Sequence, residues 1–235
     1  MGAQPKVYVL GCGGHAKVVV QTLRALDFEI AAVFDDDGRK WGKAVMGIPV
    51  NGPIPRVVEH PRLPTVIAVG DNAVRESVAA QFQLDWLTLV HPRAYVDPSV
   101  ELGPGTVVFA GAVVQAETRI GAHVIINTSA SVDHDCTVGS WAHVAPGARL
   151  AGGVTIGDGT LLGIGSVVLP ERRVGLDERL AFVLRHGGIA GGLRRRALRD
   201  RDGLGLFRGR GDLGRLDGIE LASAAGVMEE HNVFW

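Results

Sequence analysis

The chain has 235 residues, of which 46% are hydrophobic, and a formal net charge of −1 at pH 7. This length suffices for one large or two modest domains, and the near-neutral charge argues against a nucleic-acid-binding protein. The cysteines Cys12 and Cys136 lie in unrelated segments, and neither a signal peptide nor a stretch of membrane-spanning length is recognisable. We therefore expect a soluble cytoplasmic protein without a disulfide framework or membrane insertion.

The start of the chain has the pattern of a strand, a glycine turn, a helix and a second strand. The apolar run Lys6–Leu10 leads into a turn with three glycines, 16–26 has helical periodicity, and 30–34 is a second strand that ends in three aspartates. These elements form a βαβ unit.

The turn of this unit lies where the helix begins, and its residues Gly13, Gly14 and His15 are candidates for binding an anionic group such as a phosphate. Asp35 and Asp36, after the second strand, are placed to accept hydrogen bonds from a ribose or a base. The motif is not the full G-x-G-x-x-G, so the glycines could also serve only to make a tight turn.

The next segment, 38–64, is rich in Gly and Pro and reads as a connection that contains one candidate short strand at 46–50. A third strand over 65–69 ends at Gly70, and a helix over 73–82 follows. Since parallel strands end at the same edge of a sheet, the three strand ends should converge on one ligand. A last strand over 87–90 would close a first domain of residues 1–90.

An aliphatic residue then returns at every sixth position without an insertion. These positions are Val96, Leu102, Val108, Val114, Ile120, Ile126, Val132, Val138, Val144, Leu150, Ile156, Leu162, Val168, Val174 and Leu180. The residue two places earlier is usually small, and the following residue is often a glycine, as at Gly103 and Gly121.

A six-residue period fits neither a helix nor a lone strand, and it predicts stacked short strands joined by corners. The small and the aliphatic positions should both face inward, and the glycines should adopt the corner conformations. The pattern resembles the hexapeptide repeat of the left-handed parallel β-helix acyltransferases, which implies three hexads, or about 18 residues, per turn. We assign residues 91–182 to this β-helix.

Three stretches carry a more specific resemblance: the glycine turn with the following Ala16-Lys17-Val18-Val19, the Gly70-Asp71-Asn72 turn, and 127–136. Over roughly residues 6–174 the chain resembles the sugar acetyltransferases of the PglD, PerB and NeuD type. The resemblance implies an α/β N-terminal Rossmann-like domain that binds a nucleotide-linked amino sugar, followed by a β-helix that forms a homotrimer and binds acetyl-CoA between neighbouring coils.

The resemblance implies that His134 is the catalytic base and that Asp135 raises its basicity. A neutral imidazole is suited to accept the proton of an amine that attacks a thioester, and a carboxylate beside it would stabilise the charged ring. The alternative is a solvated histidine on a corner. The resemblance also assigns His143 and the backbone of Ile164 to acetyl-CoA, and Asn127 to the sugar.

His143 follows His134 by nine residues, which is half of the implied turn. Side chains half a turn apart lie on different parts of the cross-section, so a complete site should need residues from an adjacent subunit. His123, His60 and His91 receive no role and should be structural or exposed. A zinc-dependent hydratase, with His123, His134 and His143 as ligands, is disfavoured because the required close pair of histidines is missing. We thus expect no metal.

The repeat is lost after Leu180, and residues 183–235 form an atypical, arginine-rich C-terminal tail. The tail is either the product of a shifted reading frame or a variant cap, with a helix over 219–228. Three functions remain open: acetyl-CoA-dependent N-acetylation of a UDP- or GDP-linked 4-amino-4,6-dideoxy sugar, O-acetylation of a sialic-acid-type sugar, and nucleotide-sugar binding without catalysis because the C-terminus is altered.

Overall fold

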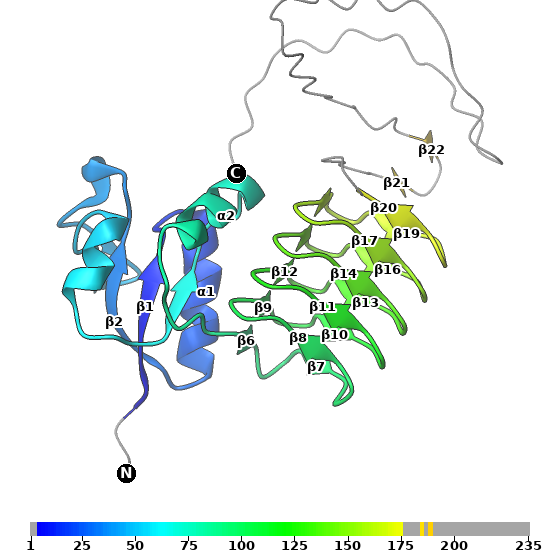
Figure 1. The fold of residues 1–235 in the computed structure, drawn as a ribbon, viewed down its shortest axis with the longest axis horizontal. Helices are drawn as coiled ribbons and strands as arrows, with labels where there is room; N and C mark the ends of the chain where they lie inside the picture. Colours follow the sequence, from blue (N-terminus) through cyan, green and yellow to red (C-terminus); the bar gives the residue numbers. More distant parts are fainter. Residues whose placement is uncertain (1–3, 176–183, 186–187, 190–235) are drawn as a thin grey trace, which may run out of the picture.

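The computed structural model of this chain describes residues 4–175 and two short strands, Leu184–Arg185 (β21) and Gly188–Ile189 (β22). An α/β domain comes first and a coil of short strands second (Figure 1). Apart from β21 and β22, the expected C-terminal tail lies outside the described residues, as do Leu180 and the helix predicted over 219–228.

The N-terminal domain contains the predicted βαβ unit. Its elements are β1 (Lys6–Leu10), α1 (Gly14–Ala25), β2 (Glu29–Phe34), β5 (Thr65–Ile67) and α2 (Asn72–Ala80). The strands form a parallel sheet in the order β2-β1-β5, so the glycine turn after β1 is flanked by the ends of β2 and β5. Strand β1 is central and buries Val7, Val9 and Leu10 completely.

The predicted connecting region contains short elements of its own. They are the 3-10 helix η1 (Gly38–Lys40), β3 (Ala44–Val45), β4 (Ile48–Pro49) and the 3-10 helix η2 (Ile54–Glu59). Strands β3 and β4 pair as an antiparallel hairpin, and Val50 extends the sheet by a bridge to Val33.

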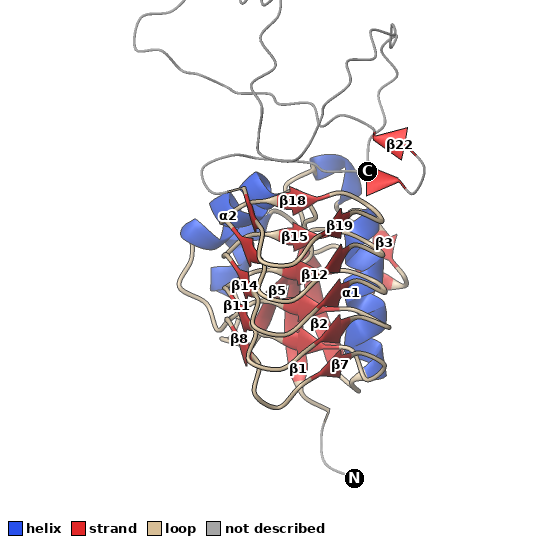
Figure 2. Ribbon diagram, turned by 90° about the vertical axis from the view of Figure 1, so that its right-hand side faces the viewer, coloured by secondary structure: helices blue, strands red, loops and turns tan. Residues whose placement is uncertain are grey.

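The second part is a parallel β-helix (Figure 2). Its two-residue strands are β6 (Leu89–Val90), β7 (Tyr95–Val96), β8 (Glu101–Leu102), β9 (Val107–Val108), β10 (Val113–Val114), β11 (Arg119–Ile120), β12 (Ile125–Ile126), β13 (Ser131–Val132), β14 (Thr137–Val138), β15 (His143–Val144), β16 (Arg149–Leu150), β17 (Thr155–Ile156), β18 (Leu161–Leu162), β19 (Val167–Val168) and β20 (Arg173–Val174). They form three five-stranded sheets, which we name after their middle strands: the β12 sheet (β6 to β18), the β13 sheet (β7 to β19) and the β14 sheet (β8 to β20).

The register confirms the repeat predicted from the sequence. Each strand pairs with residues 18 positions away, as in Val114 with Val132 and Ile126 with Val144. The aliphatic positions and the small residues two places before them fill the interior, where Ala112, Ala130 and Ala148 are fully buried. Alternation within each short strand therefore supplies a continuous core.

One predicted strand belongs to the other domain. The run over 87–90 was expected to close the N-terminal domain, but Leu89–Val90 pairs in parallel with β9 of the coil. The reason is that Val90 lies six residues before Val96, so the hexad repeat begins one unit earlier than expected. Trp86, just before it, still bridges to Thr65 of the N-terminal sheet.

Most of the glycines that follow the aliphatic positions do not adopt the expected corner conformation, although Gly175 does, with a φ of 71°. Positive φ recurs every sixth residue, at Gly105, Gly111, Glu117, His123, Ser129, Asp135, Trp141, Gly147, Gly153, Gly159, Gly165 and Glu171. Gly103 and Gly121 lie two residues before such positions and lack positive φ. A Cβ at Gly103 would come 2.5 Å from the backbone of Gly121, so these glycines permit close approach of successive coils.

The N-terminal domain packs on the outer face of the β12 sheet. Val107, Phe109 and Ile125, at most 2% exposed, join a buried cluster with Val19 and Leu23 of α1. The β13 and β14 sheets form the other two sides of the triangular coil. In the described part of the chain, neither α-helix is long and apolar enough to cross a membrane.

Candidate functional site

The ends of β1, β2 and β5 lie side by side at the edge of the sheet where the sequence predicts a ligand crevice, and we call this region, around Gly13, Gly14 and Gly70, the crevice. Gly11 needs its positive φ of 106°, and a Cβ there would lie 2.9 Å from the Ala68 carbonyl oxygen. Gly13 and Gly14, by contrast, have nothing within 4 Å of an added Cβ. Gly13 is the N-cap residue of α1, so no N-cap side chain bonds to the first N–H groups of this helix. Helix α1 thus begins at open space, which suits an anionic group at its N-terminus. Gly70 borders the same space, since its added Cβ would lie 3.8 Å from His15.

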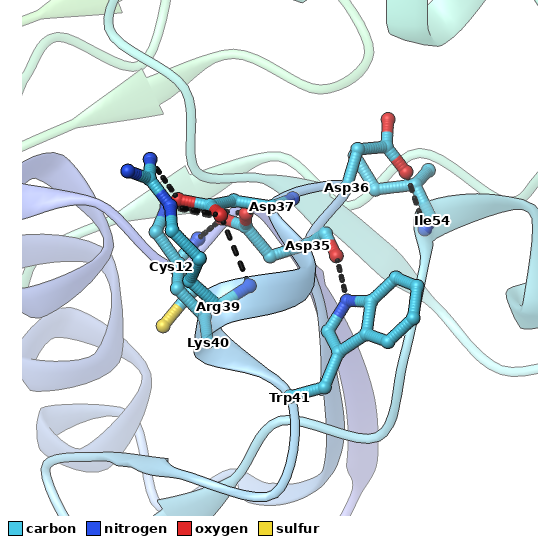
Figure 3. A network of polar contacts seen from close by, with 8 residues as sticks. All are labelled: Cys12, Asp35, Asp36, Asp37, Arg39, Lys40, Trp41 and Ile54. Carbon is cyan, nitrogen blue, oxygen red and sulfur yellow. Dashed lines mark hydrogen bonds and ion pairs between the residues drawn. The ribbon is translucent and has the colours of Figure 1, made fainter.

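The carboxylate of Asp35 forms hydrogen bonds and an ion pair with other residues of the chain (Figure 3). It accepts hydrogen bonds from the backbone of Cys12 at 2.6 Å and of Asp37 at 2.9 Å, and it pairs with Lys40 at 3.0 Å. Asp35 is only 8% exposed, so its main effect is to tie the glycine turn to the end of β2.

Asp36 differs from Asp35 in that it is exposed. One of its oxygens, Oδ1, accepts a hydrogen bond from the backbone of Ile54 at 2.8 Å, while Oδ2 has no such partner among the described residues. Of the two predicted acidic residues, Asp36 is therefore the one with an oxygen available to a ligand.

His15, Asn127 and His143 meet where the crevice faces the β12 sheet. The rings of His15 and His143 are 6.3 Å apart between centroids, and His15 packs edge-on against Phe109. The Asn127 side-chain oxygen accepts from the backbone of Thr128, so the amide nitrogen donates to Nε2 of His143 at 2.9 Å. His143 is thereby held as a neutral ring with its proton on Nδ1.

Burial keeps both histidines neutral. It lowers the pKa of His15 to about 3, assisted by His143 and Arg75, and it lowers the pKa of His143 to about 4, assisted by Arg75. The Gly70 backbone lies beside His143 and offsets part of the decrease in its pKa, although Nδ1 has no well-aligned hydrogen bond. Neither ring is charged near neutral pH.

His134 and Asp135 form a separate, exposed pair. Nδ1 of His134 lies 2.7 Å from Oδ2 of Asp135, and the side chains are 61% and 65% exposed. This hydrogen bond raises the pKa of His134, and the charge of Asp133 raises it further. Gly152, one coil on, leaves room for the ring, since an added Cβ would come 2.6 Å from Cε1. With Nδ1 bonded to Asp135, Nε2 is the ring nitrogen that has no hydrogen-bond partner among the described residues.

Within one chain, the predicted site residues therefore fall into two groups, and Ile164 lies apart from both. His134 lies on the corner between the β13 and β14 sheets, the corner opposite the β12 sheet that carries His143. The expectation that the two histidines occupy different parts of the cross-section is confirmed. Ile164 lies on another corner, between the β12 and β13 sheets, with 56% of its surface exposed.

His123 is structural, as expected. Its ring stacks on Trp141 with centroids 4.4 Å apart and an interplanar angle of 7°, and Trp86 packs against its edge at 5.0 Å. His123, His134 and His143 do not converge, and no group of three or more His, Cys, Asp or Glu residues within the described residues could hold a metal ion.

One residue of this region was missed in the sequence. Arg75 is 1% exposed and lies between the crevice and the coil, where it donates to backbone carbonyls of both. The spacing of residues on α2 is the signal that could have found it. Arg75 lies three and four residues before Val78 and Ala79, and these three are the buried residues of the helix. A charged residue at the head of an apolar helix face requires internal partners.

Comparison with known proteins points in one direction. The sequence model of the PglD N-terminal domain matches residues 6–82. The acetyltransferase domain of PglB from Neisseria gonorrhoeae FA1090, solved in complex with acetyl coenzyme A, is 33% identical, with a TM-score of 0.65 over 76% of this chain and 97% of that one. A variant of perosamine N-acetyltransferase from Caulobacter crescentus, solved with CoA and GDP-perosamine, is 34% identical, with a TM-score of 0.66 over 76% of this chain and 94% of that one.

Among curated sequences, UDP-N-acetylbacillosamine N-acetyltransferase of Bacillus subtilis (strain 168) is 40% identical over 113 residues, which cover 42% of this chain and 49% of that enzyme. The chain spans about half or less of the length of the curated relatives it matches.

Proposed function

Because this chain belongs to the family of PglD/PerB-type sugar acetyltransferases, we propose that it transfers the acetyl group of acetyl-CoA to the amino group of a nucleotide-linked sugar. Its relatives support both substrates: the PglB domain was solved with acetyl coenzyme A and the perosamine enzyme with CoA and GDP-perosamine. We take the acceptor to be a 4-amino-4,6-dideoxy sugar linked to UDP or GDP.

The hydrogen bond between His134 and Asp135 is the observation that carries this proposal. The exposed Nε2 of His134 accepts the proton that the acceptor amine loses as its nitrogen bonds to the thioester carbonyl carbon. The carbon–sulfur bond then breaks, the thiolate of coenzyme A leaves, and Asp135 stabilises the imidazolium formed on His134. The transfer is direct, without an acetylated enzyme, and in this proposal no metal takes part.

The crevice at the strand ends is the proposed nucleotide site. Gly13, Gly14 and Gly70 leave space for the diphosphate at the N-terminus of α1, beside His15. The exposed Oδ2 of Asp36 accepts a hydrogen bond from the ribose or the base, while Asp35 keeps the turn in place. On the β12 sheet, Asn127 positions the sugar and His143 contacts the acetyl group, and the Ile164 backbone contacts coenzyme A.

A complete site then needs two chains. The base lies on the corner opposite the sheet against which the crevice is built, so the His134 of one subunit serves the crevice and the His143 of a neighbour. Three subunits in a closed ring would form three equal sites of this kind, and we propose a homotrimer.

The test is release of coenzyme A from acetyl-CoA with UDP- and GDP-linked 4-amino sugars and with free sialic acid as acceptors. The variant His134→Asn should lower kcat by at least about a hundredfold because the base is lost. Its affinity for UDP or GDP, measured by calorimetry, should stay within about threefold of the unmodified protein, because no nucleotide contact is altered.

His91→Asn is the matched control, because His91 lies on a corner and its Nδ1 accepts from the backbone of Arg93, an interaction that an Asn oxygen can replace. It should leave kcat unchanged. Equal losses of turnover and nucleotide affinity in His134→Asn would contradict the role of a base. If sialic acid were the only acceptor that is turned over, the activity would be O-acetylation and not N-acetylation. If the protein bound the nucleotide but turned over no acceptor, it would be a nucleotide-sugar-binding protein without catalysis.

A further inference from the structure

Three corner residues of the coil present spare carbonyl groups to the N-terminal domain. His123, Trp141 and Gly159 are spaced 18 residues apart and share positive φ values of 54°, 65° and 65°. Each donates its N–H to the preceding coil, to Pro104, Ala122 and Ser140 respectively. The three carbonyl oxygens lie one above another on the corner between the β14 and β12 sheets and need donors from outside the coil.

Two residues of the first turn of α2 supply these donors. Arg75 donates from Nε to His123 O at 2.9 Å and from Nη2 to Trp141 O at 2.7 Å, and Asn72 donates from Nδ2 to Gly159 O at 2.9 Å. Asn72 also accepts from Nη2 of Arg75 at 2.8 Å, which joins the two side chains. Helix α2 therefore contacts the same position in three successive coils.

The same guanidinium also holds the turn after β5. Its Nη1 lies 3.2 Å from the carbonyl oxygens of both Val69 and Gly70. Gly70 borders the crevice, whereas Trp141 lies two residues before His143. One planar, five-donor group thus joins the crevice to the strand that carries His143.

Burying the charge of Arg75 costs free energy of folding, which argues that this arrangement does more than stabilise the protein. Arg75 is 1% exposed, and no carboxylate in residues 4–175 pairs with it. Burial lowers the pKa of Arg75 to about 10, so the group remains charged at neutral pH. Apart from the charge of Asp71, which raises its pKa, Arg75 is held by carbonyl dipoles. Such a buried charge demands accurate placement of every acceptor, and an apolar residue would pack there without this demand.

We propose that Arg75 is a positioning residue: it locks the Gly70 turn to the coil at Trp141 and so fixes the nucleotide-sugar site relative to His143. This inference rests on the proposed function, because it concerns the alignment of the acceptor with the donor. Without Arg75, the crevice and the coil around His143 should each keep their shape, but their positions relative to each other would no longer be fixed.

The first experiment separates binding from turnover in Arg75→Lys, which keeps the charge but loses the fork of donors. At a temperature well below the melting transition, kcat should fall about tenfold or more because the reacting groups are misplaced. The dissociation constants for CoA and for UDP or GDP should each stay within about threefold. Arg24→Lys is the control, since Arg24 donates to the Met46 carbonyl at 2.7 Å on the exposed side of the N-terminal domain, and its kcat should not change.

The second experiment needs no activity. In hydrogen exchange followed by mass spectrometry, residues 70–75 and residues 141–145 should lose protection together in Arg75→Lys and in neither segment in Arg24→Lys. If the unmodified protein shows no turnover, the proposed function fails, and the exchange result still decides the role of Arg75.

Asn72→Ala provides a second route if Arg75→Lys does not fold. It removes the bond to Gly159 and one acceptor of Arg75, and it should give the same pattern of kcat and exchange with smaller changes. A lower melting temperature with unchanged kcat, or loss of protection confined to 70–75, would overturn the proposal and leave Arg75 a stabilising residue only.

Discussion

At the scale of the residue, the corner geometry explains why two neighbours in the sequence form a pair. Adjacent side chains on a strand point to opposite faces, but His134 and Asp135 lie on a corner where Asp135 has a φ of 59°. There the carboxylate reaches Nδ1 of the ring, with the two atoms 2.7 Å apart. Asp, with its short polar side chain, is one of the few residues that adopt this backbone conformation readily.

The first prediction concerns the pH dependence of turnover. Asp135 raises the pKa of His134, and a general base acts only when it is neutral, so activity should rise as the pH rises through this pKa. Asp135→Asn should lower the pKa, move the acid limb of the kcat/KM profile to lower pH and reduce the plateau, because the base is weaker.

Asp133→Asn is the matched comparison, since Asp133 acts on His134 through its charge and bonds to the backbone rather than to the ring. Its acid limb should move in the same direction by a smaller amount. Profiles that coincide for all three proteins would show that the titrating group is not His134.

Sequence reasoning could place some residues of the proposed site and not others, for a physical reason. His134, Asp135 and His143 occupy corners and strands whose places follow from the count of six, so their positions could be assigned from the repeat. Arg75 could not be assigned, because its partners in the coil lie 48 to 67 residues away and are backbone atoms without a sequence signature. Asp35 was singled out in the sequence as a ligand contact, but its bond to the backbone of Cys12 could not be foreseen, because it depends on how the turn closes.

At the scale of the element, the coil combines two kinds of glycine. The hexads predicted the strands, because burial at each sixth position is a local requirement that every unit repeats. Most of the glycines that follow the aliphatic positions were assigned the wrong role, since a glycine that avoids a backbone clash and one that adopts positive φ look alike in a sequence. The structure separates them as Gly121, which contacts the next coil, and Gly147, which has a φ of 69° and open space.

The second prediction compares these two positions. Gly147→Ala should cost about 1 kcal/mol of unfolding free energy, because only the left-handed backbone conformation is disfavoured. Gly121→Ala should cost about 3 kcal/mol, because its Cβ would come 2.6 Å from the Ser140 nitrogen and force the coils apart. Urea unfolding at a fixed protein concentration measures both, and a larger loss for Gly147→Ala would refute this division.

At the scale of the whole molecule, the N-terminal domain and the corner that carries His134 lie on opposite sides of the coil. The domain covers the β12 sheet through Val107 and Ile125, whereas His134 is on the opposite corner of the triangle. A single chain therefore holds His134 apart from its own crevice and His143, and its activity should depend on assembly.

The third prediction tests this dependence by mixing subunits. His134→Ala and His143→Ala should each be inactive alone, because every site lacks one group. When both variants are unfolded and refolded together in equal amounts, about a quarter of the sites of a cyclic trimer receive both intact groups, one from each chain. Activity should recover to about that fraction of the unmodified protein. Mixtures that remain inactive, despite trimers in light scattering, would show that each site belongs to one chain.

The carbonyl groups that bond to α2 also determine by how many residues the coil can become longer or shorter. His123, Trp141 and Gly159 hold equivalent places in successive coils, so an insertion of 18 residues after Gly159 leaves every donor of α2 opposite its acceptor. A single extra hexad between them would rotate the next corner onto another side of the triangle and leave Asn72 without its partner. Evolution is thus expected to lengthen or shorten the coil by whole turns, and at the end remote from α1, where the C-terminal coils can diverge while the docked domain stays fixed.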